Sequence, residues 1–589
     1  MPRRVATIRL TLTRSTIAVG QSLTATAVAL DAAGRTIPHA EAPVEFGLGN
    51  GSPGRLEPAG EGKVRYVGTA AGVAQIDATA SRRTAGATVT ITTASPAAPL
   101  SEPVPDVPSG GTAGEPLPLP VPVPVPVPPI SVGPRTIVVR PGAPVGGDGS
   151  EAAPFGSLTE LDRVAGAAVA GARVVLRGGA LPVGESLVLR GGPGPDLPTI
   201  YEVPSGEVLT VYGGVDANGP PAVYGNRARW VARRGVIRIR PDPRVPHAIR
   251  RFLLVGCADV DLGVIDVAGT YSAGDATGAG SMGDNALLAC ERITLPRGGS
   301  VDVVGSTPES PSNDGDCLFI GRGCRDVTVT GWTFKRAGHV GTTVIGGELL
   351  DGVPAPATER VRFVDCTWEN EWTGGAHVNG ATRGVTFENS IFRGIGRRKA
   401  NAMSRGAMLL TGDGTAVRGA VLEDCVYAIL VQAYYFRGLF QHARGVTLQD
   451  VRGRGVDGPA LVQRAKGVDN DPPSAPDFWC ELRDLLAEGL DFTDVCRVAG
   501  EDYGTFGGRA FPFVQDYWWA SDQERAAAHA SRWLRAGVVR NSRATVAPIA
   551  GRGVGALARL EKQGLGPHQF YATGAEVAAA LPGWGVTVG

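Results

Sequence analysis

Lysine is almost absent from this chain of 589 residues, and arginine carries nearly all of its positive charge. The 57 Lys and Arg residues balance the 57 Asp and Glu residues, so the formal net charge at pH 7 is zero. Proteins that bind nucleic acid or an anionic membrane surface normally carry a basic excess, which is missing here. The composition therefore predicts no nucleic-acid partner and no basic membrane contact.

Long apolar runs are also missing, since none approaches the ~18 residues that a membrane-spanning helix needs. The first residues, MPRRVATIRLTLTR, have a basic start, but arginines and an alternating strand pattern follow where a signal peptide has its apolar core. We therefore expect a soluble chain with no membrane insertion and no classical secretion signal. A virion protein would need no such signal.

The eight cysteines form no C-x-x-C pair and have no histidine partners at zinc spacing. We interpret most of them as small buried apolar residues, with disulfides as the alternative. No phosphate-binding loop, G-x-S-x-G elbow or H-E-x-x-H motif occurs. No metal site is therefore predicted.

Calcium is the one cofactor that the sequence leaves open. The segment DNDPPSAPDF contains Asp469, Asp471 and Asp477, but these residues lack the spacing of an EF-hand loop. A solvated loop is the favoured interpretation.

Short alternating strands separated by turn residues fill residues 1–94, a pattern typical of a β-sandwich. The segments are ATIRLTLTR, SLTATAVAL, APVEFGLGN, KVRYVG, AQIDATA and TVTITT. The phrase TIAVGQSLTATAVALDAAGR, followed by GTAAGVAQIDATAS, resembles the bacterial Ig-like domains of the BIG2 type. The resemblance implies an adhesion or spacer module without catalytic residues.

A proline-rich linker follows in residues 95–134. Its core, LPLPVPVPVPVPP, cannot donate a sheet ladder and favours polyproline II. We interpret the segment as a stiff spacer of roughly 3 Å per residue.

The third region begins TIVVRPGAPVGGDGSEAAPFGSLTELDRVAGAAVAGARVVLRGG. A strand, a glycine-acid turn, an amphipathic helix and a second strand follow one another. This order resembles the entry of pectate-lyase-like right-handed β-helix proteins, in which the helix would cover the open end of the coil.

A short pattern repeats within this region, as VTVTGWTFK, VRFVDCTWE, VTFENSIFR, AVLEDCVYA and VTLQDVRGR. The starts are separated by 34, 24, 35 and 26 residues, which suits one β-helix coil with loops inserted in some coils. The fifth column holds turn-forming residues and the eighth holds aromatic residues that would stack inside the coil. The two columns read Gly331, Asp365, Asn389, Asp424 and Asp450, and Phe334, Trp368, Phe392 and Tyr427.

We therefore predict an all-β chain with a parallel β-helix over residues 135–500. The remaining residues, 501–589, are predicted to cap the solenoid or to form a subunit contact. Ser521 and Glu524 have capping-box spacing, which predicts a helix that begins near Asp522.

The ninth column follows the aromatic column and should point outward. It reads Lys335, Glu369 and Arg393, which would form a lateral row on strands about 4.8 Å apart. A mutually satisfied surface charge ladder is the simpler interpretation. The functional alternative is a sugar-binding groove, with further candidates nearby at Glu371, His339, His377, Arg397 and Arg398.

Two kinds of polysaccharide cleavage remain open. The resemblance to β-helix lyases implies a cationic base, for which Lys335 and Arg393 are the candidates, with Glu369 and Glu371 as acid or metal residues. A hydrolase would need two carboxyl groups at roughly 5 to 9.5 Å. Asp314 and Asp316, in SNDGDCLF, offer one such pair, and Glu369 with Glu371 offers a second. A turn is the favoured interpretation of the Asp pair, and the Asn-Thr-Asp and Arg-Ile-Lys signatures of polygalacturonases are absent.

The expected partner is a cell-surface or extracellular polysaccharide, and the expected location is a virion or the cell exterior. A phage tail-spike-like protein, which would be a homotrimer bound to virion structural proteins, is preferred over an extracellular bacterial lyase. A purely structural or adhesive protein is the third hypothesis, because the same scaffold carries all three functions.

Overall fold

The computed structural model describes most of the chain, and all structural statements below concern the residues that it describes. Two compact units, residues 1–126 and 127–589, are each described by themselves. No helix in the described part is long and apolar enough to cross a membrane. The described residues are 5–12, 16–18, 22–31, 36–37, 43–48, 53–58, 63–69, 72–80, 83–92, 135–212, 221–240, 252–269, 285–303, 316–350, 353–371, 373–396, 406–436, 439–466, 482–500, 503–518, 537–561 and 568–589.

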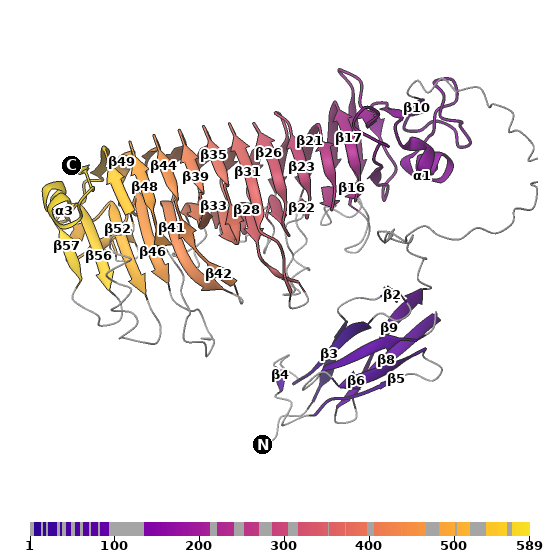
Figure 1. The fold of residues 1–589 in the computed structure, drawn as a ribbon, viewed down its shortest axis with the longest axis horizontal. Helices are drawn as coiled ribbons and strands as arrows, with labels where there is room; N and C mark the ends of the chain where they lie inside the picture. The colour runs from indigo at the N-terminus through magenta and orange to yellow at the C-terminus, as the bar shows by residue number, and fades with distance from the viewer. Residues whose placement is uncertain are drawn as a thin grey trace, which may run out of the picture. The chain divides into compact units, whose positions relative to one another are not determined.

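The first unit is a β-sandwich (Figure 1). Side chains from both sheets, among them Leu23, Tyr66, Ile76 and Val89, share one apolar core. The alternating apolar residues of the sequence supply this core, so the predicted strands are confirmed. One sheet has the order β1 (Thr7–Leu12), β3 (Ser22–Leu30), β7 (Lys63–Gly68) and β6 (Gly54–Pro58), with β4 (Thr36–Ile37) on β3; the other has β2 (Thr16–Ala18), β9 (Arg83–Thr92), β8 (Gly72–Ala80) and β5 (Glu45–Leu48).

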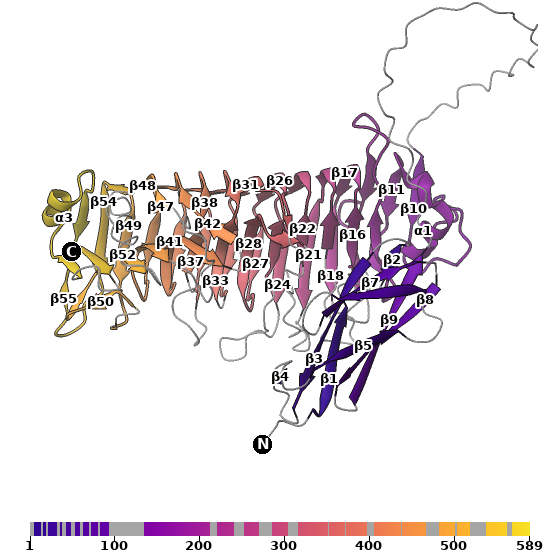
Figure 2. The same ribbon diagram turned by 60° about the horizontal axis from the view of Figure 1, so that its bottom comes forward.

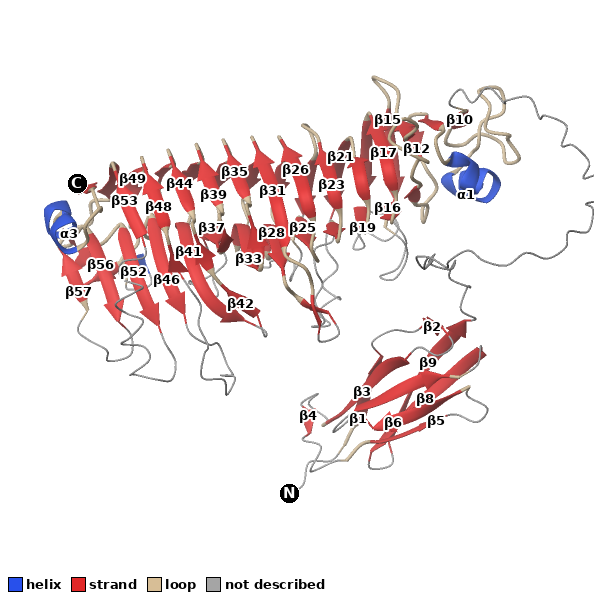
Figure 3. Ribbon diagram, viewed as in Figure 1, coloured by secondary structure: helices blue, strands red, loops and turns tan. Residues whose placement is uncertain are grey.

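The second unit is a parallel β-helix of three long sheets, which confirms the predicted fold class (Figures 1 and 3). We call the sheets I, II and III. Sheet I contains β10 (Thr136–Val139), β11 (Arg173–Leu176), β14 (Thr199–Glu202), β17 (Arg229–Arg234), β20 (Ala258–Asp261), β23 (Glu291–Leu295), β26 (Arg325–Thr330), β31 (Thr358–Val364), β34 (Thr382–Arg383), β35 (Thr386–Glu388), β38 (Gly412–Asp413), β39 (Ala416–Arg418), β43 (Ala443–Arg444), β44 (Thr447–Gln449), β47 (Leu482–Arg483), β48 (Leu485–Glu488) and β53 (Gly537–Arg540).

Sheets II and III follow sheet I in each coil. Sheet II contains β12 (Gly179–Ala180), β15 (Val208–Tyr212), β18 (Val236–Arg240), β21 (Val264–Gly269), β24 (Ser300–Val303), β27 (Thr333–Lys335), β32 (Thr367–Glu369), β36 (Ile391–Arg393), β40 (Val421–Glu423), β45 (Arg452–Arg454), β49 (Asp491–Val495), β54 (Ser542–Val546) and β58 (Val586–Val588). Sheet III contains β13 (Leu187–Leu189), β16 (Val223–Asn226), β19 (Phe252–Val255), β22 (Ala286–Leu288), β25 (Leu318–Gly321), β28 (Val340–Gly346), β33 (Gly374–Gly380), β37 (Gly406–Leu410), β41 (Tyr427–Phe436), β46 (Leu461–Lys466), β52 (Phe513–Trp518), β56 (Leu557–Glu561) and β57 (Gln569–Tyr571), with β42 (Leu439–Gln441) on β41.

Helix α1 (Leu158–Ala165) lies at the first coil, as the sequence predicts, and a 3-10 turn (Gly166–Val169) follows it. The hydroxyl of Ser157 accepts a hydrogen bond from the Glu160 backbone N–H at 3.0 Å. The Glu160 carboxylate accepts in turn from the N–H groups of Gly146 and Gly156, which lowers its pKa. Helix α1 is thereby fixed to the glycine-rich turn before it, and Leu158 enters the core of the β-helix.

Parallel pairing continues past residue 500, the predicted end of the β-helix (Figure 2). The last coils use β52, β53, β54, β56 and β58, and the short helix α3 (Gly574–Ala580) lies beside them. Val577 and Trp584 are part of the same apolar core. The helix predicted near Asp522 lies outside the described residues, as does the proline-rich linker. Short hairpins are formed by β29 (Leu349–Leu350) with β30 (Val353–Pro354), and by β50 (Thr505–Phe506) with β51 (Arg509–Ala510), which also pairs with β55 (Gly553–Val554).

The predicted turn column lies at the corner between sheets I and II. Gly331, Asp365, Asn389 and Asp450 all have left-handed backbone conformations there, with φ between +50° and +57°. The assignment of Asp424 to this column is wrong: Arg418 pairs with Glu388, so Gly419 takes the position equivalent to Asn389.

The predicted aromatic column is confirmed for three members. Phe334, Trp368 and Phe392 are fully buried on successive coils, and the Trp368 and Phe392 rings stack with centroids 4.4 Å apart. Tyr427 is wrong as the fourth member, since Leu422 is paired with Phe392. Left-handed Asp, Asn and Gly residues occur at both corners of sheet II, so the segment EDCVY was aligned with VDCTW at the wrong corner. The seven cysteines in the described part are buried and unbridged, which confirms their apolar interpretation.

Candidate functional site

The predicted row Lys335, Glu369 and Arg393 lies in register on β27, β32 and β36. Lys335 Nζ is 2.9 Å from Glu369 Oε2, and Arg393 Nη1 is 3.6 Å from Glu369 Oε1. Arg393 Nε donates to Glu423 Oε2 at 2.8 Å. All three side chains of the predicted row are therefore in ion pairs.

This row belongs to a longer charge ladder on the outer face of sheet II. The ladder, which we define as Asp302, Lys335, Glu369, Arg393, Glu423 and Arg454, alternates in sign on six coils. A hydrogen bond with Glu423 raises the pKa of Arg393, and the same contact lowers the pKa of Glu423. A base at Lys335 or Arg393 would first have to leave its carboxylate partner and lose a proton.

A second group of predicted residues meets at the connection between sheets II and III. Asp316 precedes β25, His339 lies between β27 and β28, Glu371 follows β32, and His377 lies within β33. We call these residues, together with Cys317, the II–III corner. Parallel pairing of β25, β28 and β33 places the residues on three consecutive coils. Four of these five residues were candidates from the sequence, all except Cys317. Nothing in the sequence indicated that they form a cluster separate from the charge ladder.

Asp316 and His339 form the central contact of the II–III corner. His339 Nδ1 lies 2.8 Å from Asp316 Oδ1. The Asp316 side chain is 7% exposed, whereas the His339 side chain is 46% exposed. A buried carboxylate therefore holds an imidazole that reaches solvent. With Asp316 ionised, Nδ1 carries the proton and Nε2 carries the lone pair.

His377 packs beside His339, with the ring centroids 6.0 Å apart in an edge-to-face arrangement. Burial, with a smaller contribution from the neighbouring His339, lowers the pKa of His377 to about 3. Its Nε2 is buried without a hydrogen-bond partner. A side chain at Gly374 would lie 2.4 Å from this nitrogen, so the glycine makes room for the ring.

Glu371 is fully buried beneath the corner. Burial raises its pKa well above the ordinary value. One carboxyl oxygen accepts from the Ala337 N–H, and the other lies 3.9 Å from the thiol of Cys317. Glu371 therefore fixes the segment that leads to His339. Cys317 was not recognised as a neighbour of Glu371, because its only signal was its place directly after Asp316.

Three predicted residues, Asp314, Arg397 and Arg398, lie outside the described part of the chain, as do the candidate calcium residues Asp469, Asp471 and Asp477. Within the described part, no group of three or more His, Cys, Asp or Glu side chains could hold a metal ion.

No protein-family model matches the chain, and no curated protein sequence matches it. Three solved structures illustrate the matches by fold. The alginate lyase of Paenibacillus sp. str. FPU-7 is 12% identical, covers 66% of this chain and 98% of its own, and has a TM-score of 0.34. The Family 28 exopolygalacturonase of Yersinia enterocolitica is 10% identical, covers 93% of both chains, and has a TM-score of 0.40. The surface adhesin PfbA of Streptococcus pneumoniae is 10% identical, covers 70% of this chain and 90% of its own, and has a TM-score of 0.40. At these scores the likeness selects no activity for this chain.

Proposed function

We propose that the chain binds and cleaves an extracellular polysaccharide, and that the II–III corner is its catalytic centre. The supporting observation is the contact between Asp316 and His339, in which a buried carboxylate holds a solvent-reaching imidazole. This is the arrangement of an oriented general base. The proposed base is therefore His339, in place of Lys335 or Arg393 of the charge ladder.

The reaction that this arrangement favours is β-elimination, the lyase reaction. His339 Nε2 would take the proton from the carbon beside a uronate carboxylate. The electron pair of that C–H bond would form a C=C bond, and the glycosidic C–O bond would break. The departing oxygen would recover a proton from the imidazolium. Arg397 and Arg398 remain the proposed partners of the uronate carboxylate.

Hydrolysis fits the described residues of the corner less well. A hydrolase needs two carboxyl groups that both reach the glycosidic bond. Asp316 is engaged with His339, and Glu371 is fully buried with a raised pKa. Neither is placed as a solvent-reaching nucleophile or acid.

The test is incubation of the full chain with a panel of acidic polysaccharides, with ultraviolet absorbance of unsaturated products and reducing ends recorded separately. β-Elimination raises both signals together. Reducing ends without unsaturation would replace the lyase proposal by hydrolysis. If neither signal rises with any polymer, the catalytic proposal is wrong.

An adhesive protein without catalysis is the second candidate, and the charge ladder favours it. The ladder exposes alternating charges that are already paired, which suits a regular surface better than a reaction centre. Binding of a polysaccharide without product formation would support this candidate.

We also propose the finer organisation that the sequence suggested: a bacterial Ig-like module in residues 1–94, a polyproline spacer in 95–134 and a tail-spike-like setting. Tail-spike-like proteins are expected to be homotrimers. Light scattering of the full chain tests this, since a monomer would contradict the trimer without affecting the catalytic proposal.

A further inference from the structure

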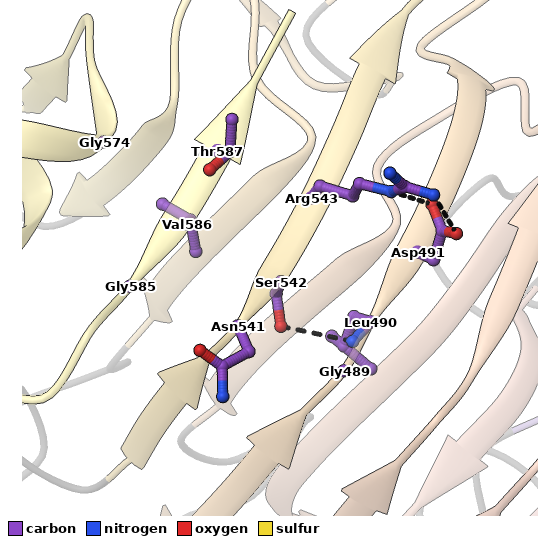
Figure 4. A pocket seen from close by; sticks show the side chains of 10 residues that line it. All are labelled: Gly489, Leu490, Asp491, Asn541, Ser542, Arg543, Gly574, Gly585, Val586 and Thr587. Atoms are coloured by element: carbon purple, nitrogen blue, oxygen red, sulfur yellow. Dashed lines mark hydrogen bonds and ion pairs between the residues drawn. The ribbon is translucent and has the colours of Figure 1, made fainter.

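A surface pocket of about 630 Å³ lies at the last coils of sheet II, apart from the II–III corner (Figure 4). It is lined by Gly489, Leu490, Asp491, Asn541, Ser542, Arg543, Gly574, Gly585, Val586 and Thr587. These residues come from β49, β54, β58 and the turns that precede them, except Gly574, which is the first residue of α3. Its volume falls in the range of small-molecule sites.

The polar wall of the pocket is a bidentate ion pair between Arg543 and Asp491. Arg543 donates from Nε and Nη2 to the two oxygens of Asp491, each at 2.7 Å (Figure 4). Hydrogen bonds from Arg543 lower the pKa of Asp491. The two charges compensate each other. An anionic ligand would be repelled by the carboxylate and a cationic ligand by the guanidinium, so the pair favours an uncharged ligand. A hydroxyl group can donate to one and accept from the other.

Glycines form much of the remaining wall. A side chain at Gly574 would lie 1.9 Å from the Val586 carbonyl oxygen, so this position must stay bare. At Gly585 the nearest atom to an added Cβ is the Asn541 nitrogen at 3.9 Å. A side chain therefore fits at Gly585 and would extend into the space of the pocket.

We propose that this pocket binds an uncharged pyranose unit of a polysaccharide. The exposed Thr587 hydroxyl, the Asn541 amide and the Asp491–Arg543 pair offer donors and acceptors for sugar hydroxyls. The side chains of Leu490 and Val586 are buried in the apolar core, so the contacts with the sugar would be made by these polar groups. The polymer would then contain neutral units as well as the uronate cleaved at the corner.

The inference rests on the proposed function for its polymer, but the pocket is a separate site. Blocking the pocket should leave cleavage of short acidic oligosaccharides at the II–III corner unchanged. Failure of cleavage in the wild type contradicts the proposed function alone, whereas failure of neutral sugars to bind contradicts the pocket alone.

The test is calorimetric titration of the full chain with neutral glucan, mannan and galactan hexasaccharides. Gly585→Val should weaken the binding of the hexasaccharide that binds best at least tenfold. Thr587→Val replaces the exposed hydroxyl by a methyl group of similar size and should weaken binding severalfold. This second variant keeps the test valid if the first variant misfolds. Gly47→Val is the matched control, because Gly47 lies in the first unit with open space around its Cβ position. The pocket proposal is overturned if none of the three hexasaccharides binds, or if both pocket variants bind as the wild type does.

Discussion

His339 and Asp316 lie on neighbouring coils of the β-helix, and the 2.8 Å contact between His339 Nδ1 and Asp316 Oδ1 joins the two coils. The carboxylate is almost fully buried and the imidazole reaches solvent. This contact couples the fold to the proposed chemistry, because an ionised Asp316 would favour the tautomer of neutral His339 with its proton on Nδ1.

Replacing Asp316 by Asn should lower kcat about 100-fold or more, since an oriented general base contributes roughly 10²–10⁴-fold. KM should change little, because Asp316 is not expected to contact the polymer. Initial rates of unsaturated-product formation measure both values. Asp326→Asn is the matched control, as Asp326 pairs with Arg360 on the exposed part of sheet I. Equal rates for Asp316→Asn and the wild type would remove Asp316 from the mechanism.

His377→Phe should make folding less sensitive to acid. The folded-state pKa of His377 is about 3, below its ordinary value of 6.5, so between these values the unfolded chain binds the proton and the folded chain does not. Stability is therefore lost as pH falls below 6.5, by about 1.4 kcal/mol per pH unit. Urea unfolding at pH 7 and pH 5 measures the difference. An identical decline in the two proteins would mean that His377 titrates normally.

Glu371→Gln should have the opposite pH signature. The folded-state pKa of Glu371 is raised, so its contribution is present below pH 4.5 and is lost as pH rises toward the folded-state value. The amide is neutral at every pH and can still accept from the Ala337 N–H. The variant should gain stability relative to the wild type from pH 5 to pH 8, as measured by urea unfolding. A variant that loses stability throughout this range would indicate an ionised Glu371.

Glu369→Gln, in the charge ladder, should change the free energy of unfolding by about 1 kcal/mol or less, because exposed ion pairs contribute little. Cleavage should persist at the wild-type rate. The stability change should shrink further at 1 M salt, where the Debye length is about 3 Å. Loss of cleavage in this variant would indicate that the charge ladder, and not the II–III corner, contains the catalytic residues.

The sequence was informative where each coil repeats a chemical requirement. Turn residues such as Asn389 and interior aromatics such as Phe392 recur because every coil needs the same corner and the same filling. The predicted alignment was wrong at Asp424 and Tyr427. Left-handed turn residues of the same kinds occur at two corners of each coil, and a nine-residue pattern does not distinguish the two corners.

The II–III corner was harder to predict than the charge ladder. Lys335, Glu369 and Arg393 occupy one column, so strand alternation alone aligned them. Asp316 and His339 lie outside the strands, in the connections that lead to β25 and β28. Their contact depends on the lengths of these two connections, which strand alternation does not predict. The buried state of Glu371 depends on the packing of three coils, which no local pattern records.

The most direct measurement compares His339→Ala with Lys335→Met on an acidic polysaccharide that the wild type cleaves, with the absorbance of unsaturated products as the signal. The account predicts that His339→Ala abolishes the signal while Lys335→Met retains it at a similar rate. Retained cleavage in His339→Ala together with its loss in Lys335→Met would contradict the account and place the base in the charge ladder.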